Sequence, residues 1–194
     1  MPITCTKASL INGYIVDLNG MVVWFDPFLE DSDKLIDDSY SQYAVRPPSV
    51  CAFTSQNCPE KIDVLITTGN EHTHFSSFVL LGKKYGFDIP IVTHAMHTKK
   101  FKSLGFTSIY PVGKSLKRNA ISFLTILGVV SYQTASYVVI NNTSGETIIF
   151  SSHGMTHSAF EDLVEDLRKV DAYFTQGIFL FSFFFLLFSP FSNF

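Results

Sequence analysis

Histidines supply the first indication of chemistry in this chain, because the imidazole ring is the commonest metal ligand among side chains. All six histidines fall into three local pairs, which are His72 with His74, His94 with His97, and His153 with His157. The segment from Asp63 to His74 is the most informative, since an apolar stretch runs directly into a turn carrying Glu71, His72 and His74. Divalent metals favour such mixtures of imidazole nitrogen and carboxylate oxygen, with bond lengths of about 2.0–2.2 Å. The turn is therefore a candidate metal site, with an exposed polar helix cap as the alternative.

A second candidate follows another apolar stretch, residues 147–150. The stretch leads to His153-Gly154, where the glycine lets the backbone turn close to a ligand. Taken alone, a histidine at the end of one strand is more often an ordinary surface side chain. His94 and His97 lie near the start of an expected helix with no carboxylate nearby, so we expect a structural role for that pair.

Apolar patterning along the chain predicts the strands and helices that position these residues. Strands are expected at residues 14–18, 21–25, 62–67, 89–93, 108–112, 120–130, 136–140, 147–150 and 171–175, and helices at residues 75–85, 96–104 and from 158 onward. Between the first two strands, Asn19-Gly20 tolerates the positive φ angles of a type I′ hairpin turn. Residues 30–58 are polar and contain two prolines, which predicts a long surface excursion. A strand-rich first part followed by strand–helix–strand implies a layered α/β sandwich.

The composition excludes several classes of protein. Of the 194 residues, 46% are hydrophobic and only 16% are charged, which excludes a disordered chain. The net charge is −3, and a mild acidic excess without a basic cluster argues against a nucleic-acid partner. The N-terminus lacks the apolar core of a secretory signal, and three cysteines without a paired spacing indicate free thiols. We therefore expect an intracellular, reducing compartment, with cytoplasm and plastid both open.

The last part of the chain has a different composition. Eight of the 20 phenylalanines lie in the last sixteen positions, so we expect residues 1–176 to form one domain and residues 177–194 an apolar tail. The apolar run at 178–188 would reach only about 16 Å as a helix, against a bilayer core of about 30 Å. A spanning helix is therefore not expected. The tail could instead be a buried final element, a segment that dips into a membrane, or a sequence foreign to the original fold.

The order of these motifs resembles the metallo-β-lactamase fold superfamily, and more narrowly a branch of metal-dependent hydrolases found in plants and cyanobacteria. The likeness covers residues 4–176 and rests on residues 20–29, 63–74 and 148–155, with Lys169-Val170-Asp171 after them. The resemblance implies an α/β fold, which is a four-layer αββα sandwich. It also implies that this sandwich is incomplete at its C-terminus. It also implies metal-assisted hydrolysis of an ester, lactone, thioester or phosphoester bond in a small-molecule substrate.

The same resemblance implies one zinc or other divalent ion held by Glu71, His72, His74 and His153. His72 and His153 would hold the ion. Glu71 would ligate it or orient the attacking water, and His74 would be a ligand or a nearby base. Asp26 would support the turn beneath the site without being a ligand. The sequence leaves the substrate and the oligomeric state open.

Several positions depart from the superfamily's His-x-His-x-Asp-His motif. Thr67 and Gly69 stand where the first two histidines would be, and Glu71 stands where the motif has aspartate. No histidine occurs between residues 98 and 152, and Ser152-His153-Gly154 replaces a Gly-Asp-Thr. A complete two-metal cage therefore cannot be assembled, which implies a degenerate hydrolase site. Two alternatives stay open: a catalytically inactive binding module that keeps the fold, and, less favoured, a membrane-associated protein that uses the apolar tail.

Overall fold

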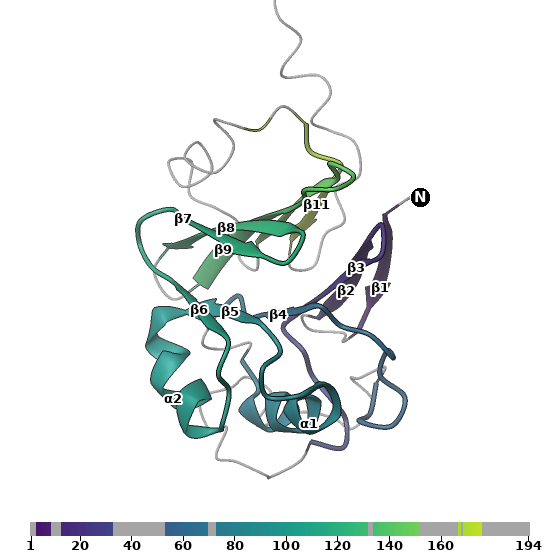
Figure 1. The fold of residues 1–194 in the computed structure, drawn as a ribbon, viewed down its shortest axis with the longest axis vertical. Helices are drawn as coiled ribbons and strands as arrows, with labels where there is room; N and C mark the ends of the chain where they lie inside the picture. Colours follow the sequence, from purple (N-terminus) through teal and green to yellow (C-terminus); the bar gives the residue numbers. More distant parts are fainter. Residues whose placement is uncertain are drawn as a thin grey trace, which may run out of the picture.

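The computed structural model describes residues 3–8, 13–32, 53–69, 73–131, 134–151, 167 and 169–175, and it contains two β-sheets that face each other (Figure 1). One sheet has six strands and the other has five. Two helices cover the outer side of the six-stranded sheet (Figure 1). The described residues thus form three layers of the expected αββα sandwich. The helix expected from residue 158 and the tail from residue 177 lie outside them.

The six-stranded sheet has an antiparallel half and a parallel half. Its strands, in spatial order, are β1 (Thr4–Lys7), β2 (Tyr14–Leu18), β3 (Met21–Phe25), β4 (Val64–Ile66), β5 (Ile91–His94) and β6 (Ile109–Val112). The first three strands pair antiparallel, whereas β3, β4, β5 and β6 pair parallel. The crossovers contain α1 (Phe75–Tyr85) and the 3-10 turn η4 (Ala95–His97), which continues into α2 (Thr98–Ser103). The carboxyl ends of β3 to β6 therefore meet along one edge, which is the usual place for a site in α/β sheets.

The five-stranded sheet is mostly antiparallel. In spatial order its strands are β11 (Ala172–Thr175), β10 (Thr147–Ser151), β9 (Thr134–Asn141), β8 (Leu124–Ser131) and β7 (Lys117–Ile121). Strands β7 to β10 pair antiparallel, and β11 pairs parallel to β10. A turn at residues 142–146 connects β9 to β10, and its Gly145 has a φ of 84°. The parallel return to β11 agrees with the expected strand–crossover–strand order.

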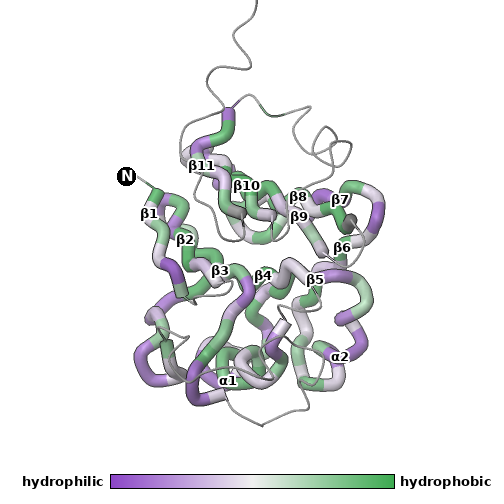
Figure 2. The backbone as a smooth tube through the Cα atoms, turned by 180° about the vertical axis from the view of Figure 1, so that it is seen from behind, coloured by the Kyte–Doolittle hydropathy of each residue, from purple (hydrophilic) through white to green (hydrophobic). Residues whose placement is uncertain are grey.

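Apolar side chains fill both spaces between the layers, and the hydrophobic segments of the backbone concentrate in the strands (Figure 2). Val23 and Phe25 of β3 face the five-stranded sheet and meet Ile126 and Phe150 there. The rings of Phe25 and Phe150, one from each sheet, stack with centroids 4.2 Å apart. Trp24 lies in the cluster beneath the helices, because neighbouring residues of a strand point to opposite faces. The alternating side chains of β3 therefore pack against the layers on both sides of it and connect all three layers.

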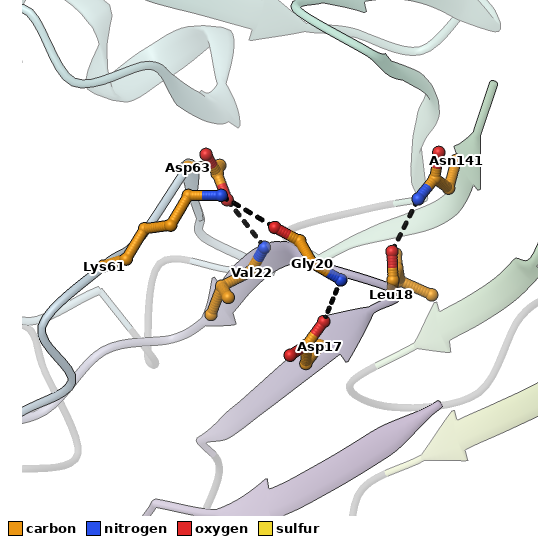
Figure 3. Close-up of polar contacts among 7 residues, drawn as sticks. All are labelled: Asp17, Leu18, Gly20, Val22, Lys61, Asp63 and Asn141. Carbon is orange, nitrogen blue, oxygen red and sulfur yellow. Dashed lines mark hydrogen bonds and ion pairs between the residues drawn. The ribbon is translucent and has the colours of Figure 1, made fainter. Parts of the chain in front are cut away.

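The β2–β3 hairpin has the turn that its Asn-Gly pair predicts. Asn19 and Gly20 have φ values of 54° and 89°, as a type I′ turn requires. The Asp17 carboxylate accepts a hydrogen bond from the Gly20 N–H at 2.6 Å, and Lys61 donates to the Gly20 carbonyl at 2.7 Å (Figure 3). The turn is thus held both by its own strand and by the segment that leads into β4.

A buried amide joins the two sheets beside this hairpin. Asn141, at the end of β9, is 1% exposed and donates its side-chain N–H to the Leu18 carbonyl at 2.5 Å (Figure 3). Its side-chain oxygen accepts the backbone N–H of Thr143 at 2.9 Å and of Ser144 at 3.4 Å. One side chain therefore orders the β9–β10 turn and ties it to the end of β2.

Two expected elements differ from the observed ones. The single strand expected at 120–130 is wrong, because a turn at Ser122, with a φ of 51°, divides this region between β7 and β8. The helix expected at 96–104 begins as η4 and continues as α2, and it ends before Gly105, whose φ of 97° suits the position after a helix. No helix in the described part of the chain is long and apolar enough to cross a membrane.

Candidate functional site

Asp26 supports the turn that follows β4. This residue comes directly after β3, is fully buried and has a φ of 44°. Its carboxylate accepts a hydrogen bond from the backbone N–H of Thr68 at 2.7 Å and another from the Thr68 hydroxyl. Burial raises the pKa of Asp26 to about 8, although both bonds from Thr68 act to lower it. The contacts give Asp26 the supporting position that the sequence predicts for it.

The five-stranded sheet holds the same turn from its other side. The Tyr137 hydroxyl donates to the Thr67 carbonyl at 2.7 Å, and the Ala135 N–H donates to the Thr68 carbonyl at 2.5 Å. Gly69 then forms an isolated antiparallel bridge with the first residue of β9. Burial raises the pKa of Tyr137 well above its usual value, so its hydroxyl remains a donor. Residues of both sheets thus fix the backbone that leads into the predicted metal motif.

His74 ends this turn and is held by two serine hydroxyls. Its ring is 5% exposed, lies against the Phe28 ring with centroids 4.6 Å apart, and directly precedes α1. The Nδ1 atom lies 2.9 Å from the Ser77 hydroxyl and 3.2 Å from the Ser32 hydroxyl. Leu29 joins this cluster, because its N–H donates to the Ser77 hydroxyl at 2.9 Å. The segment after β3 and the first turn of α1 therefore orient the imidazole together.

The serine network assigns the protonated nitrogen of His74. The Ser32 hydroxyl donates to the Leu29 carbonyl at 2.5 Å, and the Ser77 hydroxyl donates to Ser32 at 3.0 Å. With both hydroxyl protons placed in this way, the network favours Nδ1 of His74 as the donor to the serines. In the neutral ring Nε2 then carries the lone pair. This is the usual arrangement of a metal-binding histidine, whose second nitrogen donates a hydrogen bond that fixes the ring.

Solved structures show which fold these layers form. CmlA, a diiron β-hydroxylase from Streptomyces venezuelae, matches 89% of this chain and 34% of its own length, with a TM-score of 0.60 and 16% identity. The isothiocyanate hydrolase from Delia radicum gut bacteria matches 82% of this chain and 65% of its own, with a TM-score of 0.54 and 17% identity. The chain has the metallo-β-lactamase fold.

A third structure supports the same assignment. The short form of human tRNase Z matches 89% of this chain and 76% of its own length, with a TM-score of 0.52 and 12% identity. The chain spans about a third of the length of CmlA and just under two thirds of the isothiocyanate hydrolase. At these identities the likeness is one of fold. No family model and no curated protein matches the sequence.

Within this metallo-β-lactamase fold, the two positions that depart from the metal motif contribute no ligand of the imidazole type. Thr67 is fully buried, and its hydroxyl bonds with the Thr93 hydroxyl at 2.8 Å. Gly69 has no side chain, and its carbonyl accepts a hydrogen bond from the Thr73 hydroxyl at 2.7 Å. Both positions therefore serve the packing and closure of the turn.

Of the four predicted ligands, His74 lies among the described residues, whereas Glu71, His72 and His153 lie outside them. Within the described part of the chain, no group of three or more His, Cys, Asp or Glu side chains is placed to hold a metal ion. The predicted shared coordination therefore stays a prediction.

The segments that lead into the two predicted motifs, which end at Thr68 and Ser151, both contact the beginning of β9. The Thr68 carbonyl accepts the N–H of Ala135, and the next residue, Ser136, bonds through its hydroxyl with the Ser151 hydroxyl at 3.0 Å. Ser151 is the last residue of β10, two positions before His153. The segments that carry the two histidine motifs therefore leave the sheets next to each other.

The pair His94 and His97 has structural contacts, in agreement with its expected role. His94 accepts the Met96 N–H through Nδ1 at 3.0 Å, which caps η4. His97 is 4% exposed and packs edge-on against Phe75 with ring centroids 5.5 Å apart. Burial, and then the charge of His94, lowers the pKa of His97 to about 4, so this ring is neutral near pH 7.

Sequence reasoning missed the residues that orient the candidate ligand. Ser77 stands three residues after His74, a spacing that brings two side chains together at the start of a helix, so it could have been found. Ser32 and Tyr137 are 42 and 70 residues from their partners His74 and Thr67. No local pattern indicates such distant contacts.

Proposed function

We propose that this protein is a metal-dependent hydrolase with a degenerate site that binds one divalent ion, zinc or another, through Glu71, His72, His74 and His153. The orientation of His74 carries the proposal. A buried imidazole whose Nδ1 is hydrogen-bonded to two serine hydroxyls is held in one orientation with Nε2 as its second nitrogen, which is the arrangement of a metal-binding histidine. The donor set of three imidazoles and one carboxylate suits zinc in particular.

The placement of the strand ends supports the same ion-binding set. The turn before Glu71 is fixed by Asp26 on one side and by β9 on the other, and β10 ends beside β9 two residues before His153. Rigid flanks of this kind reduce the entropy that ligands lose when they converge on an ion. Two structural neighbours, a possible metal-dependent hydrolase from Veillonella parvula and the diiron hydroxylase CmlA, support the proposal of a metal in this fold.

The proposed chemistry is hydrolysis of an ester, lactone, thioester or phosphoester bond in a small-molecule substrate, which is the reaction class that the resemblance to metal-dependent hydrolases implies. A bound divalent ion would supply a water whose pKa is lowered to about 7 and would polarise the substrate oxygen. Glu71 would ligate the ion or orient the attacking water. His74, fixed by Ser32 and Ser77, would hold its ring in one position while the reaction proceeds.

Metal analysis of the purified full-length chain tests this proposal. The protein, dialysed against zinc and then against buffer, should retain about one ion per chain by mass spectrometry. His72→Ala and His153→Ala should each lose the ion, whereas His94→Ala removes an imidazole that caps η4 and should retain it. Negligible zinc in the parent protein, or full zinc in both site variants, would contradict the proposal.

A second pair of variants tests the role of the serine network. Ser77→Ala removes the hydroxyl closest to Nδ1 of His74 and should weaken zinc binding about 10- to 100-fold, as loss of such supporting partners does in other sites. Thr93→Val removes a buried hydroxyl that bonds only with Thr67 among the described hydrogen bonds, and it should leave zinc affinity within about twofold. Equal zinc affinities for the two variants would show that the serines do not orient a ligand.

The second candidate function is a binding module that keeps the fold without activity. The Thr67–Thr93 hydroxyl bond favours it, because a position that would carry an imidazole ligand is committed to packing. Such a module would fold and bind a ligand without zinc. Zinc retention in the parent protein, lost on His72→Ala, separates the two candidates.

A further inference from the structure

Charge is unevenly distributed along this chain. Residues 89–145 contain none of its 17 acidic side chains and six of its 14 basic ones, which are Lys99, Lys100, Lys102, Lys114, Lys117 and Arg118. The remainder of the chain is strongly negative, so the net charge of −3 hides the separation. The expectation that the sequence has no basic cluster is therefore wrong, because it rested on the average charge.

The fold gathers part of this basic segment at one end of the six-stranded sheet. His94 and Val112 are paired at the carboxyl ends of the parallel strands β5 and β6. Met96 and Lys114 each lie two residues beyond that pair, and both are exposed. The chain then continues to Leu116, which is also exposed. Adjacent strands are about 4.8 Å apart, so both continuations start from the same corner of the sheet.

We name this surface the basic rim and define it by Met96, Lys99, Lys114, Leu116 and Lys117. All five residues are exposed. The rim lies at the β6 edge, with α2 and β7 beside it, and β1 forms the opposite edge of the sheet (Figure 1). Positive charge therefore gathers at this edge of the sheet, whereas the rest of the sequence has a net negative charge.

Apolar side chains accompany these lysines. The large hydrophobic side chains that are exposed in the described part of the chain are Met96, Leu116 and Phe123, and all three belong to the segment without acidic residues. Met96 is 55% exposed and Leu116 is 42% exposed, both within the basic rim. An exposed aliphatic side chain among lysines costs free energy in water, and it gains free energy where a lipid surface accepts it.

We propose that the basic rim docks this protein on an anionic lipid surface. Lysines near such a surface each add a favourable electrostatic contribution, and the two aliphatic side chains supply the second signal that stable attachment requires. Recognition of a nucleic acid would instead favour arginines and stacking aromatic rings. The rim contains three lysines and no aromatic side chain, and the exposed Arg118 follows it on β7.

Docking through the basic rim would also determine which way the candidate site faces. The carboxyl ends of β4, β5 and β6 share one edge of the sheet, so docking through the rim turns this edge toward the lipid. A substrate that resides in the bilayer would then approach the turn after β4 from the membrane side. The docking itself does not depend on the proposed hydrolase function, and it would occur with metal-free protein.

Co-sedimentation of the full-length chain with vesicles tests the proposal. Binding to phosphatidylcholine vesicles containing about one fifth phosphatidylserine should exceed binding to pure phosphatidylcholine at least about tenfold at low salt, and the excess should vanish at high salt. The comparison of the two lipids removes any contribution of the apolar tail, which does not distinguish between them by charge.

Matched variants locate the contact. Lys114→Glu should abolish most of the phosphatidylserine-dependent binding, whereas Lys7→Glu makes the same charge change on β1 at the far edge and should leave most of it. Leu116→Ser should weaken binding several-fold, and Phe123→Ser, at the other end of β7, should not. Equal binding to both lipids, wild-type binding by Lys114→Glu, or capture of an RNA oligonucleotide in place of the vesicles would overturn the proposal.

Discussion

Asp26 combines complete burial with a supporting role in the turn after β4. Its carboxylate has two donors from Thr68, yet desolvation outweighs them and raises its pKa to about 8. A group whose folded-state pKa lies above its unfolded value of 3.8 binds a proton more tightly in the folded protein. The stability that it contributes is therefore present below about pH 4 and is lost as the pH rises toward 8.

Asp26→Asn should remove this dependence, because the amide is neutral at every pH and its oxygen can still accept the Thr68 N–H. Relative to the parent protein, the variant's free energy of unfolding should rise by about 2 kcal/mol or more between pH 5 and pH 8. Urea unfolding of both proteins with a chelator present measures this difference. Taking the difference cancels the opposite trend expected from His97, whose pKa is lowered to about 4. A constant difference across that range would contradict the assignment.

Local turn chemistry determined which elements the sequence could predict. The β2–β3 hairpin and the end of α2 were predicted correctly, because Asn19-Gly20 and Gly105 are residues that favour positive φ. The bounds of α1 agree with its apolar spacing. The β7–β8 hairpin was missed because its turn at Ser122 and Phe123 lacks the Gly or Asn-Gly residues that mark a positive φ in a sequence, although Ser122 has a φ of 51°.

Gly128 lies where β8 passes close to side chains of β6 and β9. A Cβ atom there would lie 2.7 Å from Cγ1 of Val112 on β6 and 2.9 Å from the Tyr137 ring on β9. Gly128→Ala should therefore lower the free energy of unfolding by about 1–3 kcal/mol, the usual range for overpacking. Gly113→Ala is the matched control, since nothing lies within 4 Å of its added Cβ. Chemical denaturation of both variants measures the effect, and equal stabilities would contradict this packing.

The candidate site depends on how the two sheets meet. The turn after β4 is fixed by Asp26 within its own sheet and by Ala135 and Tyr137 from the other. From the sequence, each histidine motif could be placed at the end of a strand, and the α/β sandwich could be inferred from the order of elements. The sequence could not show which strand of the second sheet contacts the turn after β4, because side chains far apart in sequence determine that contact. The basic rim could not be predicted from the sequence either, because its residues come from the β5–β6 connection and from the segment that leads from β6 into β7.

Asn141 tests whether the two sheets depend on one buried bond. Asn141→Asp keeps the oxygen that accepts the Thr143 N–H but replaces the N–H donor to the Leu18 carbonyl with a second oxygen. Near pH 7 a buried carboxylate would then face a carbonyl, so the free energy of unfolding should fall by at least about 2 kcal/mol. Acidification should recover part of this loss, because a protonated carboxyl can donate to Leu18. Asn142→Asp is the control, since this exposed neighbour accepts the Thr125 hydroxyl through an oxygen that the substitution keeps. Urea unfolding at pH 5 and pH 7 distinguishes the two variants, and similar losses in both would mean that the inter-sheet bond contributes little.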